Sequence, residues 1–201
     1  MICEHKCLDN HIETICHTLF NDEEILLAFL NAALECPKEQ QIVTIVEKFC
    51  SFPIQSNVWN WRFRTASKEL ITVNMQIRTP EFYHKRSLYY RSSMDQCQIA
   101  EQSKRYNTQK VVQINLLTFN LLQESTDFHT KYSLYHDQNR QSRHDVHYLE
   151  LMKIPNTSID NALYYWLRFI ICVSLNKKSK EYQELINHDP LFQRAALSLE
   201  I

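Results

Sequence analysis

The sequence predicts an α/β domain with a mixed β-sheet, flanking helices and a helical C-terminal tail, and three observations favour this class. Residues 58–64 and 71–77 alternate polar and apolar side chains and lie close enough along the chain to pair as a hairpin. A strong helix start at Thr79-Pro80-Glu81 precedes a strand-like run at 110–116, and such a crossover favours a parallel strand pair. Beyond Pro155 the remaining chain has helical patterns, and 201 residues are enough for one such domain.

The other elements follow from periodicity, caps and turn residues. The first helix is expected at 11–20, and Asn21 is expected to cap a second helix that continues through Ala33. Residues 42–49 form a short amphipathic element whose type the pattern does not decide. Further expected elements are a turn at 65–69, a helix at 79–103, strands at 130–135 and 146–152, and helices at 159–175, 179–186 and from Asp189 onward. We divide the chain into a core at 1–155 and a helical extension packed on it at 156–201.

The predicted hairpin carries uncharged and basic polar groups on one face, while Trp59, Trp61 and Phe63 on the other face are expected to lie in the core. The simpler interpretation of the polar face is a solvated outer surface, and the alternative is a site for polar chemistry. The residues that share this face are Asn60, Arg62, Arg64, Thr72, Asn74 and Gln76.

The chain contains no glycine, whereas average usage would give roughly fourteen in a chain of this length. This excludes the glycine-rich dinucleotide fingerprint, the P-loop and the Gly-x-Ser-x-Gly elbow, so no nucleotide cofactor is expected. It also leaves Asn or Asp as the expected residues at left-handed backbone positions.

Charge and cysteine usage indicate the partners and the compartment. Residues 58–110 hold ten Lys or Arg and four Asp or Glu, a surplus of six, which suits contact with a nucleic-acid backbone or, equally simply, a solvated helix surface. Seven cysteines without a signal peptide predict free thiols in a reducing cytoplasm. The apolar run at 163–175 contains Arg168 and is too short to span a bilayer, so no membrane association is expected.

Several segments, in the same order along the chain, resemble the PD-(D/E)xK nuclease family often described as transposases or recombination-promoting nucleases. Residues 71–76 (ITVNMQ) resemble its I-N-V-E-M-Q strand, 85–90 (KRSLYY) its K-R-x-L-Y-Y helix, and 112–121 (VQINLLTFNL) its I-S-I-N-I-L-D-F-N-L strand and exit. Weaker similarities extend the match over about residues 11–200; they lie at 19–31, 129–134, 147–151, 163–169 and 189–200.

The resemblance implies a restriction-endonuclease-like core that holds Mg²⁺ and hydrolyses DNA. The positions that match the family's metal-binding aspartate and glutamate are Asn60 and Asn74, while Gln76 retains the family's glutamine. An acid near the end of the first helix aligns with Glu13. The residues expected to contact the DNA backbone are Arg62, Arg64, Lys85 and Arg86.

Because both carboxylates are replaced by amides, the expected function is a DNA endonuclease homologue that is degenerate in catalysis, with no metal bound here. The alternatives are a residual nuclease, a non-catalytic module that binds nucleic acid or protein, and a decaying product of a mobile element. A rival metal site at His144, Asp145 and His147 is disfavoured because strand geometry sends the two imidazoles to opposite faces. Asp145 is instead interpreted as a charge at a sheet edge. The oligomeric state and the DNA recognised cannot be read from the sequence.

Overall fold

The structure is a computed structural model, and it describes residues 2–49, 58–78, 110–135, 142–175, 177 and 179–199. Its centre is a six-stranded sheet with the order β1-β2-β3-β4-β6-β5. The strands are β1 (Ile42–Phe49), β2 (Val58–Thr65), β3 (Leu70–Arg78), β4 (Lys110–Leu117), β5 (His129–Tyr135) and β6 (Ser142–Glu150). The pairs β3–β4 and β4–β6 are parallel and the other three pairs are antiparallel, so the sheet is mixed.

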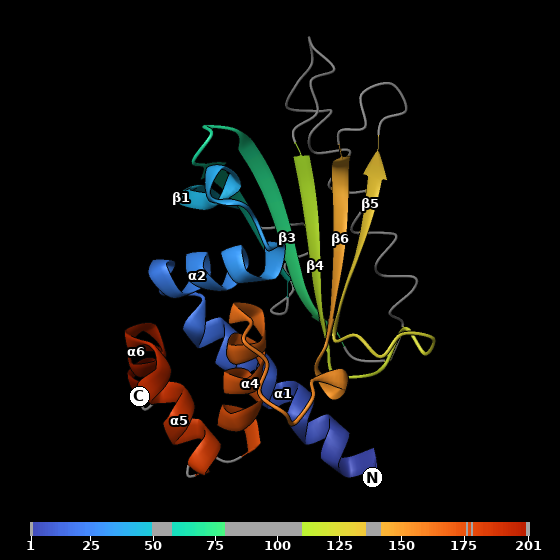
Figure 1. Cartoon of the computed structure of the whole chain (residues 1–201), viewed down its shortest axis with the longest axis vertical. Coiled ribbons are helices and arrows are strands. Elements are labelled where there is room, and N and C mark those ends of the chain that lie inside the picture. Colours follow the sequence, from blue (N-terminus) through green and yellow to red (C-terminus); the bar gives the residue numbers. More distant parts are fainter. Residues whose placement is uncertain are drawn as a thin grey trace.

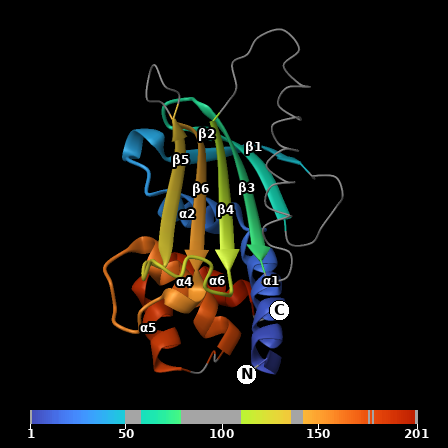
Figure 2. The same ribbon diagram turned by 90° about the vertical axis from the view of Figure 1, so that its right-hand side faces the viewer.

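The described helices lie on one side of the sheet and around its lower end (Figures 1 and 2). They are α1 (Ile2–Leu19), α2 (Glu23–Leu34), α4 (Ala162–Leu175), α5 (Lys180–His188) and α6 (Pro190–Ser198), with 3₁₀ turns at Lys38–Gln40 and Leu151–Lys153. None of these described helices combines the length and apolar character needed to cross a bilayer.

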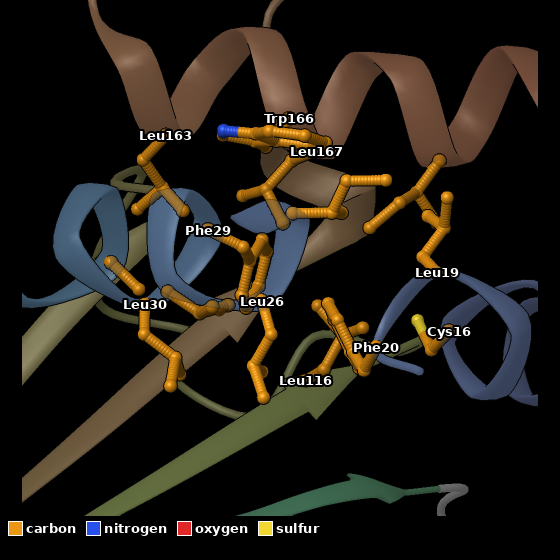
Figure 3. Packing of buried hydrophobic residues seen from close by; sticks show 14 of the residues in the cluster. Cys16, Leu19, Phe20, Leu26, Phe29, Leu30, Leu116, Leu163, Trp166 and Leu167 are labelled. Atoms are coloured by element: carbon orange, nitrogen blue, oxygen red, sulfur yellow. The ribbon is translucent and has the colours of Figure 1, made fainter. Parts of the chain in front are cut away.

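The hydrophobic core lies between this helical layer and the inner face of the sheet. In Figure 3, Trp166 and Leu167 of α4 lie above Phe29 and Leu26 of α2, with Leu116 of β4 on the sheet side. All five side chains are almost fully buried, and a buried aromatic or leucine side chain contributes about 1.5–3 kcal/mol by its removal from water. One continuous cluster therefore joins the sheet, the N-terminal helices and the C-terminal helices.

The observed architecture confirms the predicted α/β class and most of its elements. The hairpin of β2 and β3 and the parallel pair of β3 and β4 form as expected. Ser179 and Asp189 cap α5 and α6, since their side chains accept hydrogen bonds from Tyr182 N and Leu191 N. The predicted helix at 79–103 lies outside the described residues, and the division of the chain at residue 155 stays a prediction.

Several local expectations are wrong. The first helix begins at Ile2, well before His11. Residues 42–49, whose type the sequence left undecided, form the edge strand β1. The cap of α2 is Asp22 instead of Asn21, because the Asp22 carboxylate accepts from two backbone amides of the first turn, at 3.0 and 3.3 Å. Strand β6 begins at Ser142 and ends at Glu150, so it starts earlier than the alternating pattern indicated.

The left-handed positions also differ from the expectation that Asn or Asp would occupy them. Within the described residues, positive φ angles occur at Glu35 (49°), which follows the last turn of α2, and at Lys68 (66°), in the turn between β2 and β3. A residue with a Cβ in this region costs about 1–2 kcal/mol. The chain therefore accepts this strain where the helix end and the hairpin turn require it.

Candidate site: a buried amide cluster on the outer face of the sheet

The hairpin of β2 and β3 brings Asn60 and Asn74 directly opposite each other. They are partners in the antiparallel register, and their side chains emerge on the face of the sheet away from the core residues Trp61 and Met75. The Asn74 Nδ2 group donates a hydrogen bond of 2.6 Å to Asn60 Oδ1. The two amides that resemble the family's metal-binding positions therefore bond to each other.

Gln76 lies on the same face, two residues farther along β3, and belongs to a second group of amides. Its Nε2 donates to Asn115 Oδ1 at 2.5 Å, and Gln113 Nε2 donates to the same oxygen at 3.1 Å. Asn115 Nδ2 in turn donates to the His147 carbonyl at 3.2 Å. The parallel register aligns Gln76 with Asn115, so β4 extends the amide cluster that begins on β2.

The amide cluster, defined as Asn60, Asn74, Gln76, Gln113 and Asn115, is buried. The exposed fractions of Asn60, Asn74 and Gln76 are 3%, 0% and 0%. The interpretation of this face as a solvated surface is therefore wrong over the strands that carry the cluster. Gln113 and Asn115 were not selected from the sequence, although alternation along 110–116 places them on one face and could have identified them.

The remaining proposed site residues are distributed differently. Arg62 lies on the outer face and its Nη1 forms an ion pair of 3.1 Å with Glu47 on β1, while Arg64 is exposed near the end of β2. Glu13 is half-buried on α1, where its charge contributes to raising the pKa of the buried Cys16 thiol after burial itself. Lys85 and Arg86 lie outside the described residues.

The opposite face of the sheet buries charge near β5 and β6. Asp145 is paired with Lys110 at 2.9 Å and Lys131 at 3.2 Å, and it accepts a hydrogen bond of 2.6 Å from Ser133 Oγ. Asp145 is only 2% exposed and lies on the inner strand β6, so its interpretation as a charge at the sheet edge is wrong. Its carboxylate is instead neutralised by lysines from the two adjacent strands.

His147 lies on the same face as Asp145 and is linked through His129 to Glu35 at the end of α2. Its Nδ1 lies 2.9 Å from His129 Nε2, and the other nitrogen of His129 lies 3.6 Å from a carboxylate oxygen of Glu35. Burial, together with the nearby His129 and Lys131, lowers the pKa of His147 to about 3, so the ring is neutral at pH 7. As expected, His144 lies on the other face of the sheet, since it aligns with Val111 and Thr72 in the register.

A second buried carboxylate lies at the end of β6. Glu150 is fully buried, and its Oε1 accepts hydrogen bonds from the backbone amides of Leu121 and Leu122, at 2.6 and 3.2 Å. Its Oε2 is 2.8 Å from Lys153 Nζ, which also donates to the Leu122 carbonyl. Glu150 and Lys153 therefore hold residues 121–122, which follow β4, against the end of β6.

The amide cluster does not fit the Mg²⁺ ion that the resemblance implies. Mg²⁺ is usually held by one or two carboxylates together with waters and phosphate oxygens. Here Asn60 Oδ1 already accepts from Asn74, and Asn74 Oδ1 is a buried neutral acceptor with no hydrogen-bond partner among the described residues. Among these residues no three His, Cys, Asp or Glu side chains are grouped so that they could hold a metal ion.

Comparison with known proteins agrees with the fold. A family model described as PD-(D/E)XK nuclease family transposase matches residues 18–201, which include the whole sheet and the C-terminal helices. No curated protein and no solved structure gave a significant match. The mixed sheet, the helices that cover one face and this match over most of the sequence lead to one assignment: the chain belongs to the PD-(D/E)XK nuclease family transposases.

Proposed function

We propose that this chain is a degenerate member of its family, which binds DNA and hydrolyses it slowly or not at all. The observation that carries the proposal is the 2.6 Å hydrogen bond between Asn74 and Asn60, at the positions that resemble the family's two metal-binding carboxylates. Two carboxylates at this separation would repel each other unless a cation lay between them. Two amides form a hydrogen bond with each other and need no cation between them.

The electrostatic consequence is large. Each carboxylate replaced by an amide removes a unit charge at ligand distance from a divalent ion, which costs several kcal/mol even at an effective dielectric constant near 20. Without a bound ion, the attacking water keeps its high pKa and the charge on the phosphate is not offset. Neither Gln76, whose amide donates to Asn115, nor Asn115 supplies the missing charge.

DNA binding is proposed from the basic side chains that remain on and near this hairpin. Arg64 is exposed at the end of β2, Arg62 lies beside Asn60 on the same face, and residues 58–110 carry a surplus of six positive charges. Arginine contacts to phosphates release counterions, so binding of this kind weakens steeply as salt rises.

A cleavage assay that restores the acids tests the catalytic part of the proposal. Plasmid nicking with Mg²⁺ or Mn²⁺ is measured for the native chain and for the double variant Asn60→Asp/Asn74→Glu. We expect chelator-sensitive nicking to appear or to rise at least tenfold in the double variant only. Robust activity of the native chain, equal to that of the variant, would refute the degeneracy.

A matched control separates position from charge. The double variant Gln113→Glu/Asn115→Asp adds two carboxylates on the same face, one strand away, and is expected to leave nicking at the native level. Binding is tested separately, by fluorescence polarisation of a labelled duplex without divalent metal. We expect salt-sensitive binding that Arg64→Ala weakens, whereas the absence of binding at low salt would favour a module that binds protein.

A further inference from the structure

The edge strand β5 has the features of a surface that pairs with another strand. It forms one border of the described sheet, and its only strand partner there is β6 (Figure 2). Three of its seven residues expose large apolar side chains, with exposed fractions of 53% for Tyr132, 49% for Leu134 and 65% for Tyr135. An edge strand of this kind presents a row of backbone groups to a partner unless charges, proline or bulges prevent pairing.

The backbone of β5 directs alternate residues outward. The Glu150 amide donates to the Phe128 carbonyl, which makes these two residues a hydrogen-bonded antiparallel pair. Because such pairs alternate along an antiparallel ladder, the N–H and C=O groups of His129, Lys131 and Ser133 point away from β6; the register shifts between Leu134 and Tyr135, where the alternation ends. These are the groups that a further strand would use.

We propose that two copies of this chain associate through antiparallel pairing of their β5 strands about a twofold axis at Tyr132. Tyr132 is the midpoint of β5, so this register pairs Thr130–Leu134, the part before the irregularity at Tyr135, with the same residues of the second copy. Lys131 faces Ser133 of the second copy, and both residues direct their backbone groups outward, as a hydrogen-bonded pair requires. The proposal does not depend on the proposed function.

The side chains are self-complementary in this register. The Lys131 side chains are not opposite each other; each is held by Asp145 of its own copy, at 3.2 Å. The two Tyr132 rings form a non-hydrogen-bonded pair, in which cross-strand side chains come closest. Tyr132 already packs edge-on against Tyr148, with ring centroids 5.9 Å apart, so pairing would extend an aromatic row across the interface.

The opposite edge strand, β1, also exposes two apolar side chains, Val43 at 49% and Val46 at 45%, but it is less regular than β5. Its register with β2 shifts twice, between Ile42 and Thr44 and between Ile45 and Glu47, whereas the register of β5 with β6 shifts once, between Leu134 and Tyr135. Strand β1 also carries two adjacent charged residues, Glu47 and Lys48, near its end. Irregularities and charges of this kind protect an edge from pairing. We therefore assign the interface between the two copies to β5.

The pairing has one geometric consequence for the amide cluster. An antiparallel pair about a twofold axis keeps the same face of both sheets on one side of the joint sheet. Asn60, Asn74, Gln113 and Tyr132 share one transverse row in the register. The two clusters would therefore face the same side and lie along one line.

A charge-swap experiment on the full chain tests the pairing. Sedimentation velocity is measured from about one micromolar to the solubility limit. We expect the native chain to dimerise reversibly, and Tyr132→Lys or Tyr132→Glu to weaken dimerisation about tenfold or more, because like charges then face each other at the axis. An equimolar mixture of the two variants is expected to restore the dimer. The control is Val43→Lys, a half-exposed position on β1, which should dimerise like the native chain.

Either of two results would overturn the proposal. One is a native chain that stays monomeric at every concentration. The other is a native dimer that Tyr132→Lys leaves intact, which would assign the interface to another surface. Melting curves of the Tyr132 variants guard against loss of fold, and recovery of the dimer in the mixture shows directly that both variants remain folded.

Discussion

The two faces of the sheet bury polar groups in opposite ways. On the inner face and at the end of β6, the chain keeps Asp145 and Glu150 as buried carboxylates, and each has at least one lysine within 3.2 Å. On the outer face, the amide cluster is equally buried and carries no formal charge. The comparison teaches that this chain buries carboxylates where a lysine neutralises them, and buries only neutral amides on the other face, at the positions that we propose match its family's metal ligands.

The largest loss of stability is expected from removing the lysine that neutralises Glu150. Lys153→Met should lower the free energy of unfolding by about 3–5 kcal/mol, because it leaves Glu150 buried with an uncompensated charge. Chemical denaturation at pH 7 measures the change. Lys180→Met removes an exposed lysine that pairs with Glu184, and we expect no measurable loss. Equal losses in the two variants would show that the burial of Glu150 is unimportant.

A smaller effect, dependent on pH, is expected from His147. Its folded-state pKa of about 3 lies below the ordinary value of 6.5, so the unfolded chain binds a proton that the folded chain does not. Stability from this group is therefore fully present above pH 6.5 and is lost as pH falls, by about 2 kcal/mol between pH 6.5 and pH 5.

The measurement is the free energy of unfolding as a function of pH for the native chain and for His147→Gln. The variant should lose part of the acid-dependent slope in this window and keep the part that comes from His129, whose pKa burial also lowers. His11→Gln, which alters an exposed histidine on α1, should keep the native slope. A slope unchanged by His147→Gln would contradict the assignment.

The smallest effect concerns the turn that joins the two strands bearing Asn60 and Asn74. Lys68 has a φ angle of 66°, and asparagine tolerates this region better than lysine. Lys68→Asn should therefore raise the melting temperature, with a gain of at most about 1 kcal/mol. Lys38→Asn, at the start of the 3₁₀ turn, serves as a control in which no such gain is expected. A loss at position 68 would show that the turn is not strained.

The sequence predicted what depends on local pattern. Period-two alternation identified the hairpin, and the order of strand, helix start and strand identified the parallel pair of β3 and β4. The predicted starts of two C-terminal helices, at Ser179 and Asp189, coincide with their observed caps. The family resemblance is confirmed by the match over residues 18–201.

What the sequence did not predict depends on contacts between distant segments. The polar face was expected to be solvated, because alternation shows that a face is polar without showing that it is buried. The neutralisation of Asp145 needs lysines from β4 and β5, which the register alone brings together. The bonds from Leu121 and Leu122 to Glu150 join residues 28 and 29 positions apart. The roles proposed for Asn60, Asn74, Gln76 and Glu13 stay predictions.

Titration calorimetry with Mn²⁺ tests the central claim most directly. The native chain, whose Asn60 and Asn74 amides bond to each other, should show no saturable binding up to about millimolar metal, because the cluster supplies no charge to offset the cost of dehydrating the ion. Asn60→Asp/Asn74→Glu should bind the ion, and the metal should raise its melting temperature. Saturable binding by the native chain with an affinity equal to that of the double variant would contradict the account.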